Sequence, residues 1–198
     1  DIMGNKISCQ RNLFNIPDEI VYLNTAYISP LSLKVEKAIN KGCKLETEPW
    51  KIDPEFHFFY QIKETKIIFS NLFNISYKNV SLIPSASYGI STAANNIKLT
   101  KTKNKILILK DQFPSNVYPW MELSKKQEGV LEIIDDLNET TLTEEIINKI
   151  SEEVAVVAIP NIRWTDGYII DLKKVSGACK KFDVNLILDL TQSAGAMQ

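Results

Sequence analysis

The sequence predicts an α/β fold built from alternating βα units around a mostly parallel sheet. Short apolar runs recur along the chain, and a segment with helical periodicity separates each run from the next. Each run is short enough for a strand that is buried on both faces. The 198 residues are 44% apolar and 24% charged, an ordinary composition for a protein with one sizeable core. The predicted strands are Val80–Ile83, Lys105–Leu109, Val130–Ile134, Val154–Ile159 and Val184–Leu188.

Two helices are expected ahead of the first run. Ser29-Pro30 is a helix-start signal, and the apolar stripe that follows it ends near Pro49. Asp53-Pro54 opens a second, longer helix that runs to about Phe73. Four further helices connect the strands, and Thr141 with Glu144 forms a capping box for the third of them. These connecting helices are expected at Ser87–Ile97, Ser115–Lys126, Leu142–Ile150 and Asp171–Lys181.

Composition argues against several classes of protein. The chain has 23 lysine and arginine residues and 24 acidic residues. This balance offers no excess of positive charge for nucleic acid and argues against a nucleic-acid-binding protein. No apolar run approaches the length of a membrane span, and we expect no signal peptide. Cys9, Cys43 and Cys179 form no CxxC pair, which favours reduced thiols in the cytoplasm. His57 is the single histidine, so a multi-histidine metal site is excluded and no metal is expected.

In open parallel sheets, ligands bind beyond the carboxyl ends of the strands. Asp189 ends the last apolar run, Val184–Leu188. A carboxylate taken out of water is costly unless a cation or good donors meet it. Asp189 therefore either caps a turn just past the buried part of the strand, or lies below a positively charged group.

The residues after the other strands allow a similar choice. Ser85 and Ser87 begin a helix whose free N–H groups suit a phosphate, although a plain serine cap is the simpler interpretation. Phe113 is either core packing or a flat face for an aromatic ligand. Arg163, in a loop with Trp164, either binds an anion or forms a surface ion pair. Together these strand ends predict a pocket for a planar, phosphorylated, cationic heterocycle.

Five segments resemble the class V aminotransferase family of pyridoxal-phosphate enzymes of fold type I, in the family's order and spacing. They are VYLNTAYISPL (21–31), PSASYGIS (84–91), DQFPSNVYPW (111–120), PNIRWTDGYIIDL (160–172) and LILDLTQSAG (186–195). The family includes cysteine desulfurases, kynureninases and isopenicillin-N-epimerase-like proteins. The resemblance implies an incomplete fold type I large domain. Residues 1–50 would be an N-terminal segment and helix, and residues 51–198 the cofactor-binding large domain.

The resemblance also implies the cofactor, pyridoxal 5'-phosphate, and its contacts. Asp189 matches the aspartate that hydrogen-bonds the pyridine nitrogen, so that the protonated ring can act as an electron sink. Gln192 matches the glutamine near the phenolic oxygen. The phosphate-binding turn matches Ala86 and Ser87.

The remaining site residues follow from the same resemblance. Phe113 takes the ring-stacking position, and Trp164 lines the cofactor and substrate. Asn24 and Tyr27 belong to a stretch that approaches the substrate, and Arg163 is a further candidate for substrate contact.

Three departures from the family pattern are visible. Cysteine desulfurases place a histidine at the position of Phe113, and relatives often carry histidine at the position of Arg163. The family's Schiff-base lysine follows the strand after the aspartate, and the sequence ends at Gln198 before such a strand. Lys180 and Lys181 precede the aspartate strand, so the Schiff-base lysine is absent from the chain.

The resemblance therefore predicts a pyridoxal-phosphate-dependent transferase or lyase that acts at the Cα of a small amino-acid substrate, as a homodimer in full-length form. The 198-residue chain alone would be inactive. The alternative is a non-catalytic binding or scaffold protein that kept the fold without the lysine. A nucleotide-binding oxidoreductase is disfavoured, because no G-x-G-x-x-G follows any strand.

The resemblance makes one further prediction about the sheet. In fold type I, two later strands separate the strand that matches Val80–Ile83 from the strand that matches Val184–Leu188. The four strands from Lys105 onward should therefore form a contiguous parallel sheet, with Val80–Ile83 detached from it.

Overall fold

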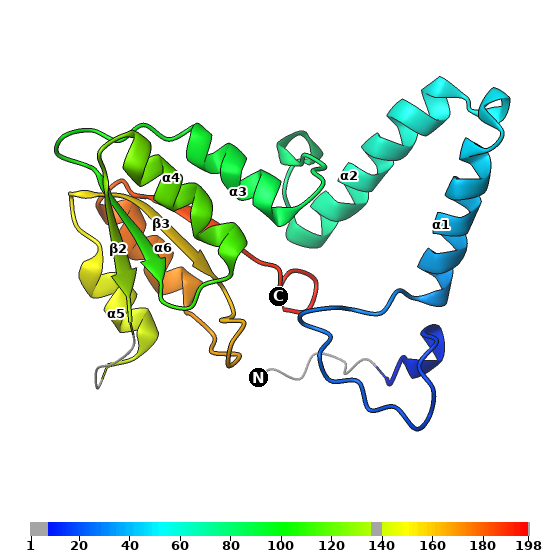
Figure 1. Cartoon of the computed structure of the whole chain (residues 1–198), viewed down its shortest axis with the longest axis horizontal. Coiled ribbons are helices and arrows are strands. Elements are labelled where there is room, and N and C mark those ends of the chain that lie inside the picture. Colours follow the sequence, from blue (N-terminus) through cyan, green and yellow to red (C-terminus); the bar gives the residue numbers. More distant parts are fainter. Residues whose placement is uncertain (1–7, 136–139, 198) are drawn as a thin grey trace. The chain divides into compact units, whose positions relative to one another are not determined.

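The computed structural model describes residues 8–135 and 140–197. The chain divides into two compact units, Asp1–Leu82 and Ile83–Gln198. The first unit contains α1 (Leu33–Glu46) and α2 (Gln61–Phe73), joined by short helical turns (Figure 1). The domain boundary expected at residue 50 stays a prediction.

The second unit is built on a four-stranded parallel sheet in the order β2-β1-β3-β4. Its helices alternate with the strands along the chain, as the sequence predicts. The strands are β1 (Lys105–Leu109), β2 (Val130–Ile134), β3 (Val154–Pro160) and β4 (Asn185–Asp189). The helices are α3 (Ala86–Asn95), α4 (Tyr118–Lys126), α5 (Leu142–Lys149) and α6 (Leu172–Lys181).

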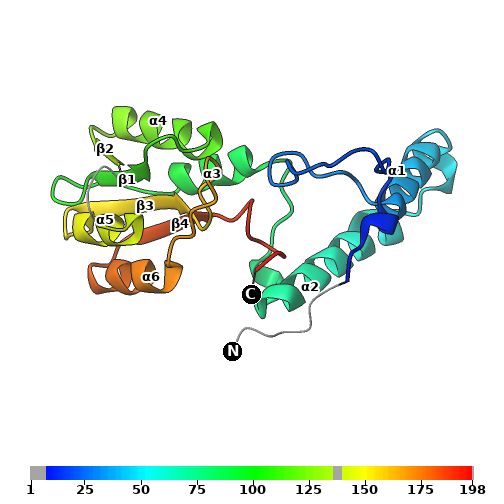
Figure 2. The ribbon, with the colours of Figure 1, turned by 90° about the horizontal axis from the view of Figure 1, so that it is seen from below.

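Helices cover both faces of this sheet, which gives three layers (Figure 2). On one face, α3 and α4 pack on the strands through a cluster that includes Ile90, Trp120 and Ile106. On the other face, α5 and α6 pack through Ile146, Val175 and their neighbours. Every residue of β3 is buried, as expected for a central parallel strand.

The apolar run Val80–Ile83 is not a strand. It is an extended segment after the helical turn Tyr77–Asn79, and in the part of the chain that the structure describes it pairs with no strand. The expectation of a strand there is wrong, because a strand needs a neighbour for its backbone groups. The expectation that this run would not pair with β4 is confirmed for the described residues.

Several helix boundaries differ from expectation. The helix expected at Ser115 starts only at Tyr118, after a separate 3-10 turn over Pro114–Asn116. Pro119 explains the delay, because a proline inside a helix clashes with the carbonyl four residues earlier, here that of Ser115. The first helix starts at Leu33 and not at Pro30, because the Ser32 hydroxyl accepts the hydrogen bond from the N–H of Val35.

Two other local predictions fare better. The capping box of α5 is present, with Thr141 and Glu144 each accepting a hydrogen bond from the other's backbone. The segment after Asp53-Pro54 is helical to Phe73, although Glu55–Tyr60 is wound as a π-helix ahead of α2. The Asp53 carboxylate caps it by accepting from the N–H groups of Glu55 and Phe56.

Candidate functional site

Asp189 is the last residue of β4 and is partly buried. Its Oδ1 atom accepts hydrogen bonds from the backbone N–H and the hydroxyl of Thr191, at 3.1 and 2.5 Å. Within the described residues, the other oxygen, Oδ2, has no hydrogen-bond partner. The acid therefore caps a turn with one oxygen and keeps the second available as an acceptor.

A cavity of about 330 Å³ lies between the end of β4 and the first turns of α3. Asp189 and Ala86 both line it. Gly89 closes its α3 side, where a Cβ atom would lie only 2.7 Å from Cδ1 of Ile83. The strand-end acid and the start of the predicted phosphate turn therefore border one space.

The first turn of α3 has the features of an anion site. The Ser85 hydroxyl accepts from the N–H of Tyr88 and so caps the helix. The first N–H groups of a helix have no acceptor within the helix, so those of Ala86 and Ser87 are available to a ligand. Ala86 and Ser87 are both exposed.

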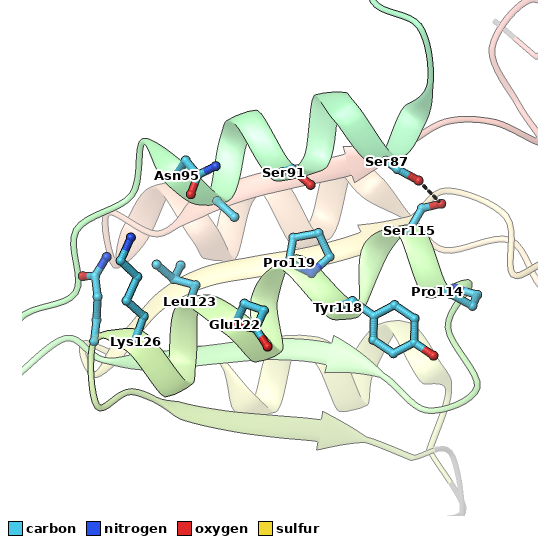
Figure 3. Close-up of a pocket in the computed structure, with 12 residues that line it drawn as sticks. Ser87, Ser91, Asn95, Pro114, Ser115, Tyr118, Pro119, Glu122, Leu123 and Lys126 are labelled. Atoms are coloured by element: carbon cyan, nitrogen blue, oxygen red, sulfur yellow. Dashed lines mark hydrogen bonds between the residues drawn. The ribbon is translucent and has the colours of Figure 1, made fainter.

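Ser87 is joined to the loop after β1. Its hydroxyl donates to the hydroxyl of Ser115 at 2.9 Å, and the two side chains point toward one another from the ends of α3 and of the turn before α4 (Figure 3). Both serines lie at one end of a groove of about 590 Å³ between α3 and α4. Ser115 follows Phe113 by two residues, so the phosphate turn and the predicted stacking residue are neighbours.

Phe113 and Trp164 form an aromatic corner. Their ring centroids lie 5.5 Å apart and their planes are nearly perpendicular, at 88°. The indole N–H of Trp164 donates to the backbone carbonyl of Asp111 at 2.8 Å, which ties the loop after β3 to the loop after β1. Both rings keep exposed area, 36% for Phe113 and 45% for Trp164, so a ligand could still contact them.

The loop that carries Trp164 is held by a two-bond fork. Nε and Nη2 of Arg163 donate to the two carboxylate oxygens of Asp166 at 2.9 and 2.5 Å. These hydrogen bonds, with one from the N–H of Tyr168, lower the pKa of Asp166 to about 2. The Arg163 guanidinium also lies over the Tyr168 ring, 5.6 Å from its centroid. Substrate contact by Arg163 stays a prediction.

A buried asparagine supports the loop after β1. Oδ1 of Asn116 accepts from the indole N–H of Trp120 at 2.9 Å, and both side chains are fully buried. This bond anchors the turn that presents Phe113 and Ser115. Within the described residues, Nδ2 of Asn116 is a buried nitrogen without a hydrogen-bond partner.

The remaining predicted residues are less constrained. Gln192 is partly buried in the turn after β4. Asn24 and Tyr27 belong to the first unit, where the N–H groups of Tyr27 and Ile28 donate to the Asn24 carbonyl and the Tyr27 side chain is exposed. Their approach to the substrate stays a prediction.

Two hydroxyl residues at these strand ends, Ser115 and Thr191, do not follow from sequence reasoning. Each contacts a predicted site residue, Ser87 and Asp189 respectively. Their closeness in sequence to Phe113 and Asp189 could have indicated a place in the site. It was a weak indication, because a serine or threonine in a turn most often hydrogen-bonds the nearby backbone.

The fold is that of fold type I pyridoxal-phosphate enzymes, as solved structures with the same arrangement make clear. A C-DES mutant with glycine covalently linked to the PLP cofactor superposes with a TM-score of 0.82 at 17% identity, over 96% of this chain and 51% of that one. A cysteine desulfurase from Thermococcus onnurineus NA1 gives a TM-score of 0.78 at 18% identity, over 94% of this chain and 48% of that one. The predicted fold class is confirmed.

The sequence model of the family "Aminotransferase class-V" matches residues 52–198, so the chain belongs to that family. A probable cysteine desulfurase of Borreliella burgdorferi is 25% identical over 183 residues, which cover 90% of this chain and 40% of that protein. A kynureninase of Shouchella clausii is 22% identical over 200 residues, covering 94% of this chain and 46% of that protein. The chain thus spans less than half the length of these two relatives.

No helix in the described ranges, 8–135 and 140–197, is both long enough and apolar enough to cross a membrane.

Proposed function

We propose that the chain forms the cofactor-binding part of a pyridoxal-phosphate-dependent enzyme that acts at the Cα of an amino-acid substrate. The observation that carries the proposal is the cavity shared by Ala86 and Asp189, where a carboxylate with an available oxygen borders the same space as a helix N-terminus. A phosphorylated pyridine needs both of these groups, an anion site and an acceptor for its ring N–H.

The residues present fit this cofactor in their chemistry. Ala86 and Ser87 would hold the phosphate through backbone N–H groups and one hydroxyl. Phe113 supplies a flat apolar face, and Oδ2 of Asp189 would accept from the ring nitrogen. Gln192, in the turn after β4, would contact the phenolic oxygen. When bound, pyridoxal phosphate supplies an electron sink for a carbanion at Cα.

Phe113 bears on the reaction type. A phenylalanine has no group that takes up or releases a proton, so this position cannot perform acid–base chemistry. The probable cysteine desulfurases and the kynureninase among the relatives differ in reaction, and the proposal extends to a transferase or lyase without choosing between them. Neither the fold nor the comparisons favour the non-catalytic alternative.

We also propose a homodimer in the cytoplasm for the full-length protein. Family membership supports the dimer, and the three free cysteines suit a reducing compartment. A small amino acid would be the substrate, with Asn24, Tyr27, Trp164 and Arg163 as candidate contacts.

Equilibrium dialysis of pyridoxal phosphate against the gene product that contains this chain tests the proposal. Asp189→Asn should weaken binding by about tenfold or more, because a charge-assisted hydrogen bond to the ring nitrogen is lost. Asp135→Asn is the matched control, since Asp135 follows the end of β2 and pairs with Lys110 at the outer edge of the sheet. Equal affinities for the wild-type protein and Asp189→Asn would reject the assignment.

A further inference from the structure

The two oxygens of the Asp189 carboxylate have different surroundings. Oδ1 accepts from both the N–H and the hydroxyl of Thr191. Oδ2 has no partner among the residues that the structure describes. The backbone N–H would be enough to make the turn after β4, so the hydroxyl is a second bond to an oxygen that is already capped.

This second bond has a geometric consequence. The terminal torsion angle of an aspartate, χ2, has a broad distribution, so a carboxylate that accepts a single hydrogen bond can still rotate about χ2. Two donors from one residue fix both the plane of the carboxylate and the identity of the oxygen that stays available. The hydroxyl bond is short, at 2.5 Å, as charge-assisted O–H···O⁻ bonds are.

The cavity beside Asp189 makes the orientation matter. Of the described residues that line it, Asp189 is the only one that carries an ionisable group. The other lining side chains from β4 and α3 are apolar, among them Ile187, Leu188 and Ile90. A ring nitrogen in this space would therefore meet one charged acceptor, the Asp189 carboxylate. The proton affinity of the nitrogen would depend on the orientation of that carboxylate.

We propose that Thr191 is a positioning residue for the cofactor. Its hydroxyl holds Oδ1 of Asp189, so that Oδ2 faces the pyridine nitrogen and keeps it protonated. The inference rests on the proposed function and deepens it, because it assigns to Thr191, which lines the same cavity, a role that acts through the acid.

The test uses 4'-deoxypyridoxal 5'-phosphate, which lacks the aldehyde and so reports binding and ring protonation without any covalent link to the protein. Ultraviolet absorption of the bound analogue across a pH series gives the midpoint at which the ring nitrogen loses its proton. Fluorescence titration gives the dissociation constant in the same samples.

Thr191→Val removes the hydroxyl and keeps both the N–H and the branched shape. We expect the midpoint of ring deprotonation to fall by roughly one pH unit and the dissociation constant to rise about threefold to tenfold. Thr191→Ser keeps a hydroxyl and should restore both values. Thr65→Val is the control, because among the described residues that hydroxyl bonds only the Gln61 carbonyl within α2.

The outcomes separate the two claims. If Thr191→Val keeps the wild-type midpoint while Asp189→Asn loses ring protonation, Thr191 merely caps the turn and the positioning role is wrong. If the wild-type protein does not bind the analogue, or Asp189→Asn leaves the midpoint unchanged, the proposed function fails and the positioning role with it. If Thr191→Val does not fold, Thr191→Ala, which also keeps the N–H, must show the same shift.

Discussion

At the scale of single residues, the role proposed for Phe113 depends on the area and orientation of its ring. The Trp164 ring lies nearly perpendicular to the Phe113 ring, and both rings keep exposed area. We expect Phe113→Tyr to be tolerated and Phe113→Ala to weaken cofactor retention by about 1 kcal/mol or more, because stacking area is lost. Dissociation constants measured by dialysis check this. Tyr118→Ala is a suitable control, since Tyr118 is exposed on α4 outside the aromatic corner. An unchanged constant for Phe113→Ala would make Phe113 a packing residue.

The three cysteines should differ sharply in reactivity. Cys179 is buried on the inner face of α6, and burial raises the pKa of its thiol to about 11. At pH 8, roughly one Cys179 thiol in a thousand is then ionised, and the thiolate is the reactive form. Cys9 and Cys43 are exposed. Mass spectrometry after iodoacetamide treatment should find both of these alkylated and Cys179 intact; early alkylation of Cys179 would contradict its place in the core.

At the scale of elements, the loop after β3 behaves as a small hairpin. Ile162 and Ile169 form an antiparallel bridge, and Gly167 supplies the left-handed turn with a φ of 77°. The fork between Arg163 and Asp166 closes the loop. Trp164 is therefore presented by a braced loop and not by a free one.

This bracing predicts a pH dependence. The pKa of Asp166 is lowered from 3.8 to about 2, so the fork stabilises the loop fully above pH 4 and loses its effect as the pH falls through about 2. The carboxylate is partly exposed, so salt should weaken the effect. Trp164 fluorescence below pH 4 should change in the wild-type protein, and Asp166→Asn should show the low-pH signal already at pH 7. Identical spectra for the two proteins at pH 7 would show that the fork does not position Trp164.

Elements were predictable wherever one local cause dominated. Apolar runs located all the strands from Lys105 onward to within a residue, and Thr141 with Glu144 fixed the start of α5. The prediction of a strand at Val80–Ile83 was wrong because an apolar run indicates only that a segment can be buried, whereas a strand also requires a neighbouring strand to pair with. Pro119 determines the start of α4. This proline is visible in the sequence, but the helical periodicity around it favoured an earlier start.

The sequence predicted the strand-end positions of the acid and of the aromatic residues in the candidate site, but not the contacts that Ser115 and Thr191 make there. Asp189 and Phe113 stand out in sequence because each is unusual at a strand end. Ser115 and Thr191 are common turn residues. The partner of Thr191 lies only two residues away, whereas the partner of Ser115 becomes visible only when separate strand ends meet. The bond between Ser87 and Ser115 joins residues 28 positions apart, a distance that no local pattern reports.

At the scale of the whole molecule, the chain carries open surfaces. In the described residues β4 pairs only with β3, so its outer edge has unpaired backbone groups. In the first unit, Ile68 and Leu72 on α2 are 63% and 71% exposed, and Phe59 just before α2 is 65% exposed. A helix with this much exposed apolar surface is normally covered by further protein.

We therefore expect residues 1–198 on their own to be poorly stable and to self-associate. Sedimentation velocity should find species larger than a monomer, and thermal melting should lack a single sharp transition. A double variant, Ile68→Lys with Leu72→Glu, should reduce association without touching the sheet. A monodisperse monomer with one cooperative transition would contradict this expectation.

The strand order β2-β1-β3-β4 also dictates when the pocket can exist. During synthesis β1 can pair with β2 first, since Lys105 lies beside Val130, and β3 must then add to the other side of β1. Of the four described strands, β4 follows the other three along the chain and carries Asp189, and its hydroxyl partner Thr191 comes just after it. Nascent chains stalled with β3 outside the ribosome should protect the β1–β3 core from proteolysis yet retain no 4'-deoxypyridoxal 5'-phosphate. We therefore expect the cofactor to enter only after β1, β2 and β3 have paired, so that it can stabilise β4 in its place but cannot guide the pairing of the three earlier strands.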